Sequence, residues 1–129
     1  MVIHSDEVEP RIFDGTQLRG TGWRLGAAAG ADRVGLSRYR IAAGERAMPV
    51  HVHADEEELF YVLDGEGLSW HDGRAYPVRA GDCILHRPGA EPHTILGAGA
   101  GLDVLAFSDG SDTGLTWLPR ARAWWNGPH

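Results

Sequence analysis

Residues Gly44–Gly65 read GERAMPVHVHADEEELFYVLDG, and this stretch decides the expected fold and site. Side chains two apart in a β-strand point to the same face, so His51 and His53 place two imidazoles side by side on a rigid support. The acidic turn after them, which we expect to be solvated, brings the chain back, and Glu58 begins the next strand at the same spot. Phe60 and Val62 share its face, so they are predicted to line an apolar cavity there.

A second stretch supplies another imidazole. Residues 81–93 read GDCILHRPGAEPH, in which Gly81-Asp82 opens a strand, residues 87–92 form a turn, and His93 begins the following strand. His86 lies in the strand that leads to the turn, and we interpret it as structural rather than as a further ligand.

Working outward, short apolar runs alternate with Gly, Asp and Pro from about residue 34 to residue 108, which is typical of a β-sandwich or barrel. Asp72-Gly73 is predicted to form a two-residue hairpin turn, and Asp64-Gly65 and Ala80-Gly81 are predicted to reverse the chain. The predicted strands are Val34–Ile41, Pro49–His53, Glu58–Leu63, Gly67–His71, Arg74–Val78, Asp82–His86, His93–Ile95 and Asp103–Phe107.

The 129 residues suggest one domain. We expect an N-terminal extension (1–33) that packs on the barrel, the barrel itself (34–110), and a C-terminal tail (111–129) that packs on the barrel or on a second subunit. The segment Gly20–Ala31 is interpreted as a loop or an extra strand. In the tail, the adjacent Trp124 and Trp125 require a packing surface.

Charge and composition exclude several classes of protein. The net charge is −6 and no basic run occurs, which argues against nucleic acid or an anionic membrane as a partner. Cys83 is the one cysteine, so no internal disulfide can form. The acidic N-terminus does not resemble a signal peptide, and no apolar run approaches the ~20 residues of a membrane span. We expect a cytoplasmic protein.

The two stretches together resemble the paired motifs of the cupin superfamily: His-x-His, an acidic turn and Glu-Leu-Phe-Tyr-Val-Leu-x-Gly, followed by Gly-Asp-x-x-x-x-x-Pro-Gly-x-x-Pro-His. The resemblance implies an all-β double-stranded β-helix, also called a jelly roll or cupin barrel. It also implies a metal site, with His51, His53, Glu58 and His93 as the ligands. Counting back from Gly65 selects Glu58, and Glu57 is the alternative.

The sequence departs from the family pattern in three places. The first motif has an extra residue after Gly44, the second has one before Pro88, and Gly97 replaces an Asn that often follows the last His. Both insertions fall in turns, so they put the rim of the pocket in question rather than the ligands.

Three imidazoles and one carboxylate suit a single divalent transition metal (Fe, Mn, Ni, Zn, Co or Cu) and do not select among them. They leave up to two positions of an octahedral ion open. We therefore expect an oxidoreductase of oxygenase type, such as a metal-dependent dioxygenase, acting on a small anionic chelating substrate. The alternatives are a metal-dependent isomerase or decarboxylase, and a non-catalytic module that binds a small molecule or metal.

Two further expectations concern the sheet faces. Arg38 and Arg40 share one face of the first barrel strand, where they would bind a substrate carboxylate if that face looks inward, although an exposed pair is commoner. Leu59, Tyr61 and Leu63 face away from Glu58 and need cover, which an N-terminal strand or a twofold partner would supply. A homodimer is therefore expected.

Overall fold

The computed structural model describes residues 1–15, 18–46, 48, 52–53, 55–71, 73–89, 92–109, 115–118 and 122–126, with the backbone alone for 52–53, 115–118 and 123–126. The elements are a 3-10 turn at Ser5–Glu7, strands β1 (Arg11–Gly15) and β2 (Leu18–Arg24), helix α1 (Leu25–Ala29), and strands β3 (Gly35–Ile41), β4 (Val52–His53), β5 (Glu58–His71), β6 (Arg74–Arg79), β7 (Cys83–His86), β8 (His93–Ser108), β9 (Leu115–Leu118) and β10 (Ala123–Asn126).

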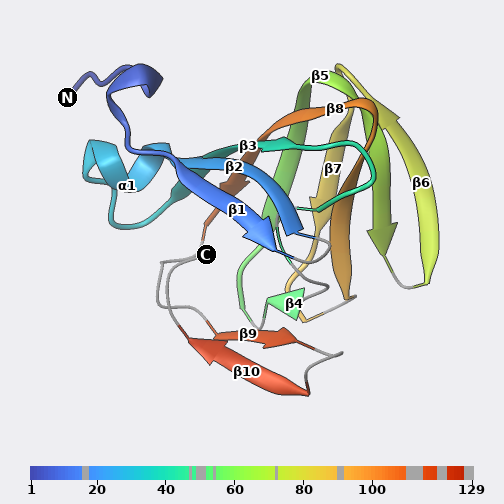
Figure 1. Ribbon diagram of the computed structural model, residues 1–129. Coiled ribbons are helices and arrows are strands. Elements are labelled where there is room, and N and C mark those ends of the chain that lie inside the picture. The colour runs from blue at the N-terminus through green and yellow to red at the C-terminus, as the bar shows by residue number, and fades with distance from the viewer. Residues whose placement is uncertain are drawn as a thin grey trace.

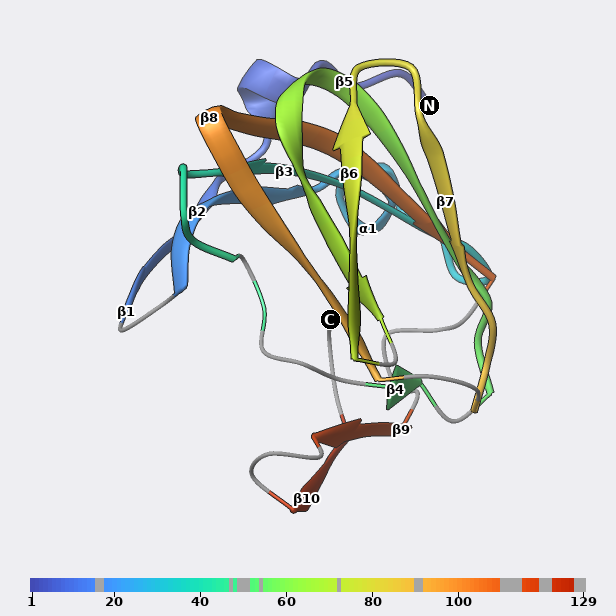
Figure 2. The same ribbon diagram turned by 90° about the vertical axis from the view of Figure 1, so that its right-hand side faces the viewer.

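The strands form two antiparallel sheets. The larger has seven strands in the order β1-β2-β3-β8-β5-β6, with β7 paired to β5. The smaller has the order β10-β9-β4 and lies below one end of the larger sheet (Figures 1 and 2). The prediction of an all-β fold is confirmed.

Strands β5 and β8 dominate the architecture because each runs through both halves of the barrel. The first half of β5 pairs with β7 and with the end of β8, and its second half pairs with β6 and with the start of β8. Both strands curve strongly along their length (Figure 2). This curvature lets one pair of long strands enclose a core.

The prediction that Asp64-Gly65 reverses the chain is wrong. Strand β5 continues through these residues, and its register to β8 shifts between Val62 and Asp64 and again between Gly65 and Glu66. Gly65 has a φ of 84°. A bulge needs the same left-handed backbone that a tight turn needs, so the local sequence signal is the same for both. Residues 58–63 and 67–71 are therefore one bent strand.

The other predicted turns have mixed outcomes. Ala80-Gly81 does reverse the chain, with the Asp82 amide donating to the Arg79 carbonyl over 3.0 Å. Gly73 has a φ of 78°, as the predicted hairpin requires, while Asp72 lies outside the described residues. Likewise, the predicted strands His93–Ile95 and Asp103–Phe107 are two ends of the single strand β8.

The core follows the alternation of side chains along β3 and the first half of β5. In β5 the residues Glu58, Phe60 and Val62 are buried, while the residues between them are exposed. The same pattern puts Tyr39 and Ile41 of β3 inside. The remaining buried apolar residues are Val78, Ile84, Ile95, Leu102, Val104 and Ala106.

The N-terminal residues extend the large sheet. Strand β2 pairs with β3 and β1 pairs with β2, so a hairpin continues the sheet beyond the barrel strands. The segment Gly20–Ala31 divides into the end of β2 and the five-residue helix α1, which ends at Gly30 with a φ of 89°. In the described part of the chain, no helix has the length and apolar character needed to cross a membrane, and the cytoplasmic location stays a prediction.

Candidate metal centre

Three ionisable side chains meet inside the barrel: Glu58, His86 and His93. Each offers one donor atom, and these donor atoms all lie within 4.8 Å of one another. Glu58 Oε1 is 3.5 Å from His93 Nε2. The imidazoles of His86 and His93 are stacked, with ring centroids 3.8 Å apart and an angle of 18° between their planes.

The cluster is closed off from solvent. The exposed fractions are 6% for Glu58, 5% for His86 and 1% for His93. Polar groups at this depth are costly to bury unless they find partners that replace water. Such a cluster therefore indicates a specific role rather than a chance meeting of surface groups.

Three strand ends bring these side chains together. Glu58 begins β5, His86 ends β7, and the two residues lie directly opposite each other in the β5–β7 register. His93 begins β8 and lies opposite His71 of β5. All three point inward because each shares its strand face with core residues, such as Phe60 beside Glu58 and Ile84 beside His86.

The two histidines of the first stretch are described less fully. His53 ends β4, a two-residue strand that pairs with β9, and its side chain is outside the description. His51 lies outside the described residues altogether. Their part in the site remains a prediction.

Burial distinguishes Glu58 from Glu57, the two glutamates considered as ligands. Glu58 points inward, whereas Glu57 is exposed and its backbone amide donates to the Asp109 carboxylate over 2.9 Å. Glu57, the alternative ligand, therefore faces away from the cluster. Glu56 departs from the expectation of a solvated turn, because only 2% of it is exposed.

A small cavity adjoins the cluster. Its lining residues are Tyr39, Ile41, Met48, Phe60, His93, Thr94 and Ile95. Phe60 lies in this wall as predicted, while Val62 is buried one step further along β5. Burial raises the pKa of the Tyr39 phenol, and the Glu58 carboxylate raises it further. The phenol is thus protonated at neutral pH and can donate a hydrogen bond within the barrel.

Comparison with known proteins identifies the family to which this chain belongs. The family model described as a cupin domain matches residues 37–107, more than half of the chain. The chain belongs to the cupin family. A structure described as an uncharacterized conserved protein with a double-stranded β-helix domain, from Klebsiella pneumoniae, is 13% identical, covers 99% of this chain and 97% of its own, and superposes with a TM-score of 0.67. The predicted fold class is therefore confirmed.

Several proteins similar to this cupin carry functional names, three of which follow. An oxalate-binding protein from Thermotoga maritima is 29% identical over 77% of this chain and 84% of its own length. A solved structure named "predicted oxalate decarboxylase", also from Thermotoga maritima, is 26% identical, has a TM-score of 0.69, and matches 84% of this chain and 98% of its own. A "putative sugar phosphate isomerase" from Acidithiobacillus ferrooxidans is 25% identical, with a TM-score of 0.81 over 95% of this chain and 80% of its own.

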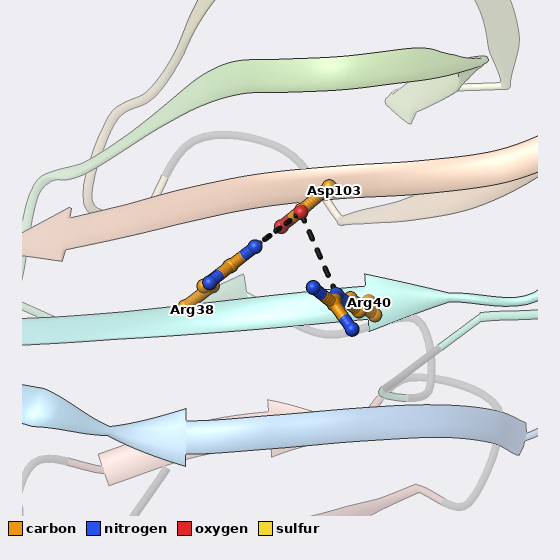
Figure 3. A network of polar contacts seen from close by, with 3 residues as sticks. All are labelled: Arg38, Arg40 and Asp103. Carbon is orange, nitrogen blue, oxygen red and sulfur yellow. Dashed lines mark hydrogen bonds and ion pairs between the residues drawn. The ribbon is translucent and has the colours of Figure 1, made fainter. Parts of the chain in front are cut away.

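Arg38 and Arg40 lie away from the cavity of the cupin barrel. They alternate with Tyr39 and Ile41, which point inward, so both arginines occupy the outer face of β3. There Arg38 binds Asp103 of β8 through two hydrogen bonds of 2.9 and 2.6 Å, and Arg40 approaches the same carboxylate at 3.6 Å (Figure 3). The expectation that Arg38 and Arg40 would bind a substrate carboxylate depended on an inward orientation, and both side chains face outward.

This outer cluster is a complete structural unit. The hydrogen bond to Asp103 raises the pKa of the Arg38 guanidinium. Both guanidinium groups also lie over the Trp23 ring, 5.5 and 5.6 Å from its centroid. These contacts tie β2, β3 and β8 together across their outer surface, so both arginines have a structural role there.

The donor set inside the barrel fits a transition metal. Imidazole nitrogen suits Fe, Ni, Cu and Zn, and a carboxylate oxygen completes a mixed set of the kind these ions accept. A divalent cation would also offset the cost of burying the Glu58 carboxylate. The fold and the chemistry of the site thus agree with a metal centre, whose ion the ligand types alone do not specify.

Proposed function

We propose that this cupin binds one divalent transition metal through His51, His53, Glu58 and His93. The observation that carries the proposal is the convergence of Glu58 and His93, 3.5 Å apart and buried, at the ends of two strands that the family motifs single out. His51 and His53 enter from the family pattern; His53 ends β4, and His51 lies outside the described residues.

The metal itself would attract the substrate. Three neutral imidazoles and one carboxylate leave a divalent ion with a net charge near +1, which favours an anionic oxygen ligand. Among the described residues, no lysine or arginine lines the small cavity beside the cluster, and Arg40 lines a separate, open pocket on the outer surface with Asp64 and Asp103. A phosphate, which demands more positive charge, is therefore a poorer candidate than a small carboxylate, enediolate, diketonate or catecholate.

The reaction we favour is of oxygenase type. Apolar side chains beside the cluster, among them Ile41, Phe60 and Ile95, suit a site that admits O₂, and the cavity that they line has a volume of only about 10 Å³. The name of the oxalate-binding relative from Thermotoga maritima supports a small anionic ligand. Two alternatives use the same ligands: decarboxylation or isomerisation with the metal as a Lewis acid, and binding without turnover.

One series of measurements separates these readings. Elemental analysis of the purified protein is expected to find about one transition ion per chain. Protein loaded in turn with Fe(II), Mn(II), Ni(II) and Cu(II) is then offered diketones, enediols, catechols and oxalate in an oxygen electrode. We expect O₂ uptake with at least one pair. Turnover without O₂ would replace the oxygenase by the Lewis-acid enzyme, and binding without any turnover would leave a non-catalytic module.

We propose, second, that the protein is a homodimer that pairs through the outer face of β3, β5, β7 and β8. Phe107 of β8 lies opposite both Leu36 of β3 and Leu59 of β5, and Leu59 lies opposite Leu85 of β7. All four are exposed at 36–44%. A contiguous apolar surface is uncommon on monomers, and because apolar groups complement one another, it suits a twofold contact with a second copy.

Replacing Phe107 by Asp is expected to convert the dimer to a monomer, because each copy would bury a charge at the centre of this face. Light scattering after gel filtration measures the mass. Ile12→Asp is the matched control, since Ile12 is 69% exposed on β1, outside this face, and its replacement should leave the dimer intact. A wild-type protein that stays monomeric at high concentration contradicts the proposal.

A further inference from the structure

His86 is a fourth imidazole, at an unspecified position of the second family motif, and it is not one of the ligands that the motifs imply. It ends β7 opposite Glu58, with its ring stacked on that of His93 at 3.8 Å. Its other neighbours are aromatic: Phe60 meets it edge-on at 5.6 Å and His71 at 5.8 Å. His86 therefore lies within the cluster, beside both the carboxylate of β5 and the imidazole of β8.

The spacing of the donor atoms suits a single ion. With metal–ligand distances of about 2.1 Å, adjacent donors of an octahedral ion are about 3.0 Å apart and opposite donors about 4.2 Å. The donors of Glu58, His86 and His93 lie within 4.8 Å of one another, and the Glu58–His93 pair is at 3.5 Å. An imidazole binds a metal through the lone pair in its ring plane, so the stacked rings of His86 and His93 would have to rotate about their side-chain torsions until both planes pointed at the ion.

The position of His86 in its strand also supports a role as a metal ligand. Ile84 and His86 share the inward face of β7 and are equally buried. Polar groups at this depth need partners that replace water. A metal ion bound to one ring nitrogen would be such a partner.

We infer that His86 binds the metal, as a ligand additional to those of the two motifs. This inference rests on the proposed metal site. With His51 and His53 also bound, an octahedral ion would keep one open position, so the anionic substrate would attach through a single oxygen atom. Four imidazoles would also move the preference of the site toward Cu, Ni and Zn and away from Mn.

The test replaces His86 by Phe and loads the protein with Cu(II). Phe keeps the aromatic stack on His93 but lacks a donor nitrogen. Pulsed electron paramagnetic resonance is expected to show one fewer coupled imidazole nitrogen than in the wild type, and titration is expected to show at least a 10-fold weaker Cu(II) affinity. The matched control is His71→Phe, which removes the neighbouring imidazole, stacked on Tyr76 at 4.4 Å. That variant should keep the wild-type spectrum.

A second variant, His86→Ala, leaves a space that free imidazole can occupy. Added imidazole is expected to restore the missing nitrogen signal in this variant. A wild-type spectrum and affinity in His86→Phe would overturn the inference and assign His86 to positioning His93 through stacking. Wild-type protein that binds no transition ion at all would instead overturn the proposed function, and the inference with it.

Discussion

Replacing Glu58 by Gln is expected to weaken metal binding by at least about 100-fold, equivalent to about 2.8 kcal/mol. The carboxylate supplies the one negative charge among the proposed ligands, and an amide oxygen of the same size does not replace it. Packing should be conserved because Gln is isosteric with Glu. Titration with Co(II) or Cu(II), followed by its absorption bands, measures the affinity directly.

Thermal unfolding gives an independent reading of the same change. A ligand at 100 times its dissociation constant stabilises the fold by about 2.7 kcal/mol, so the wild type should melt at a higher temperature with metal than without. The Glu58→Gln variant should lose this increase.

Glu57→Gln is the control for this prediction. It makes the same chemical change one residue earlier, on the exposed side of the strand start. Wild-type affinity is expected for Glu57→Gln. A loss of binding there, with full binding in Glu58→Gln, would contradict the placement of the carboxylate ligand.

The orientation of Glu58 could be predicted from the sequence because two simple rules agree on it. Alternation along a strand gives Glu58, Phe60 and Val62 one face, and the spacing to Gly65 in the family motif selects the same glutamate. The structure buries all three residues and exposes Glu57. Which face of a strand a residue occupies depends on its immediate neighbours in the chain, so it can be predicted from the sequence.

Alternation would also have found His86, had the pairing of β7 been known. His86 shares its face with Ile84, and the register to β5 sets it opposite Glu58. That register depends on which strands become neighbours across the barrel, and no residue of β7 encodes this locally. From the sequence alone, a lone histidine in a core strand is therefore interpreted as structural. The outward orientation of Arg38 follows from alternation along β3, which buries Tyr39.

The length of β5 and β8 could not be predicted for a different reason. Glycine followed or preceded by a polar residue indicates left-handed backbone, and both chain reversals and bulges use it. Gly81 reverses the chain, whereas Gly65, with a similar φ, bends a continuing strand. The two cases differ in what surrounds the glycine: Gly65 lies against the backbone of a neighbouring strand and Gly81 does not. These neighbours come from distant parts of the sequence.

Gly65→Ala is therefore expected to destabilise the fold by roughly 3–5 kcal/mol, combining left-handed strain with overpacking. Gly65 has a φ of 84°, where an L side chain is strained. A methyl group there would also come far inside van der Waals contact with the Gly101 carbonyl oxygen of the neighbouring strand. Backbone cannot swing aside as a flexible side chain can, so β5 and β8 would have to separate at the bend.

Gly81→Ala isolates the strain from the collision. Gly81 has a φ of 93°, yet a methyl group there would meet no atom within 4 Å. Its cost should be roughly 1 kcal/mol, the penalty for a left-handed residue with a side chain. Urea unfolding of both variants measures the difference. Equal losses in the two variants would show that backbone strain alone fixes Gly65, whereas a much larger loss at Gly65 would show that the close approach of two long strands requires glycine there.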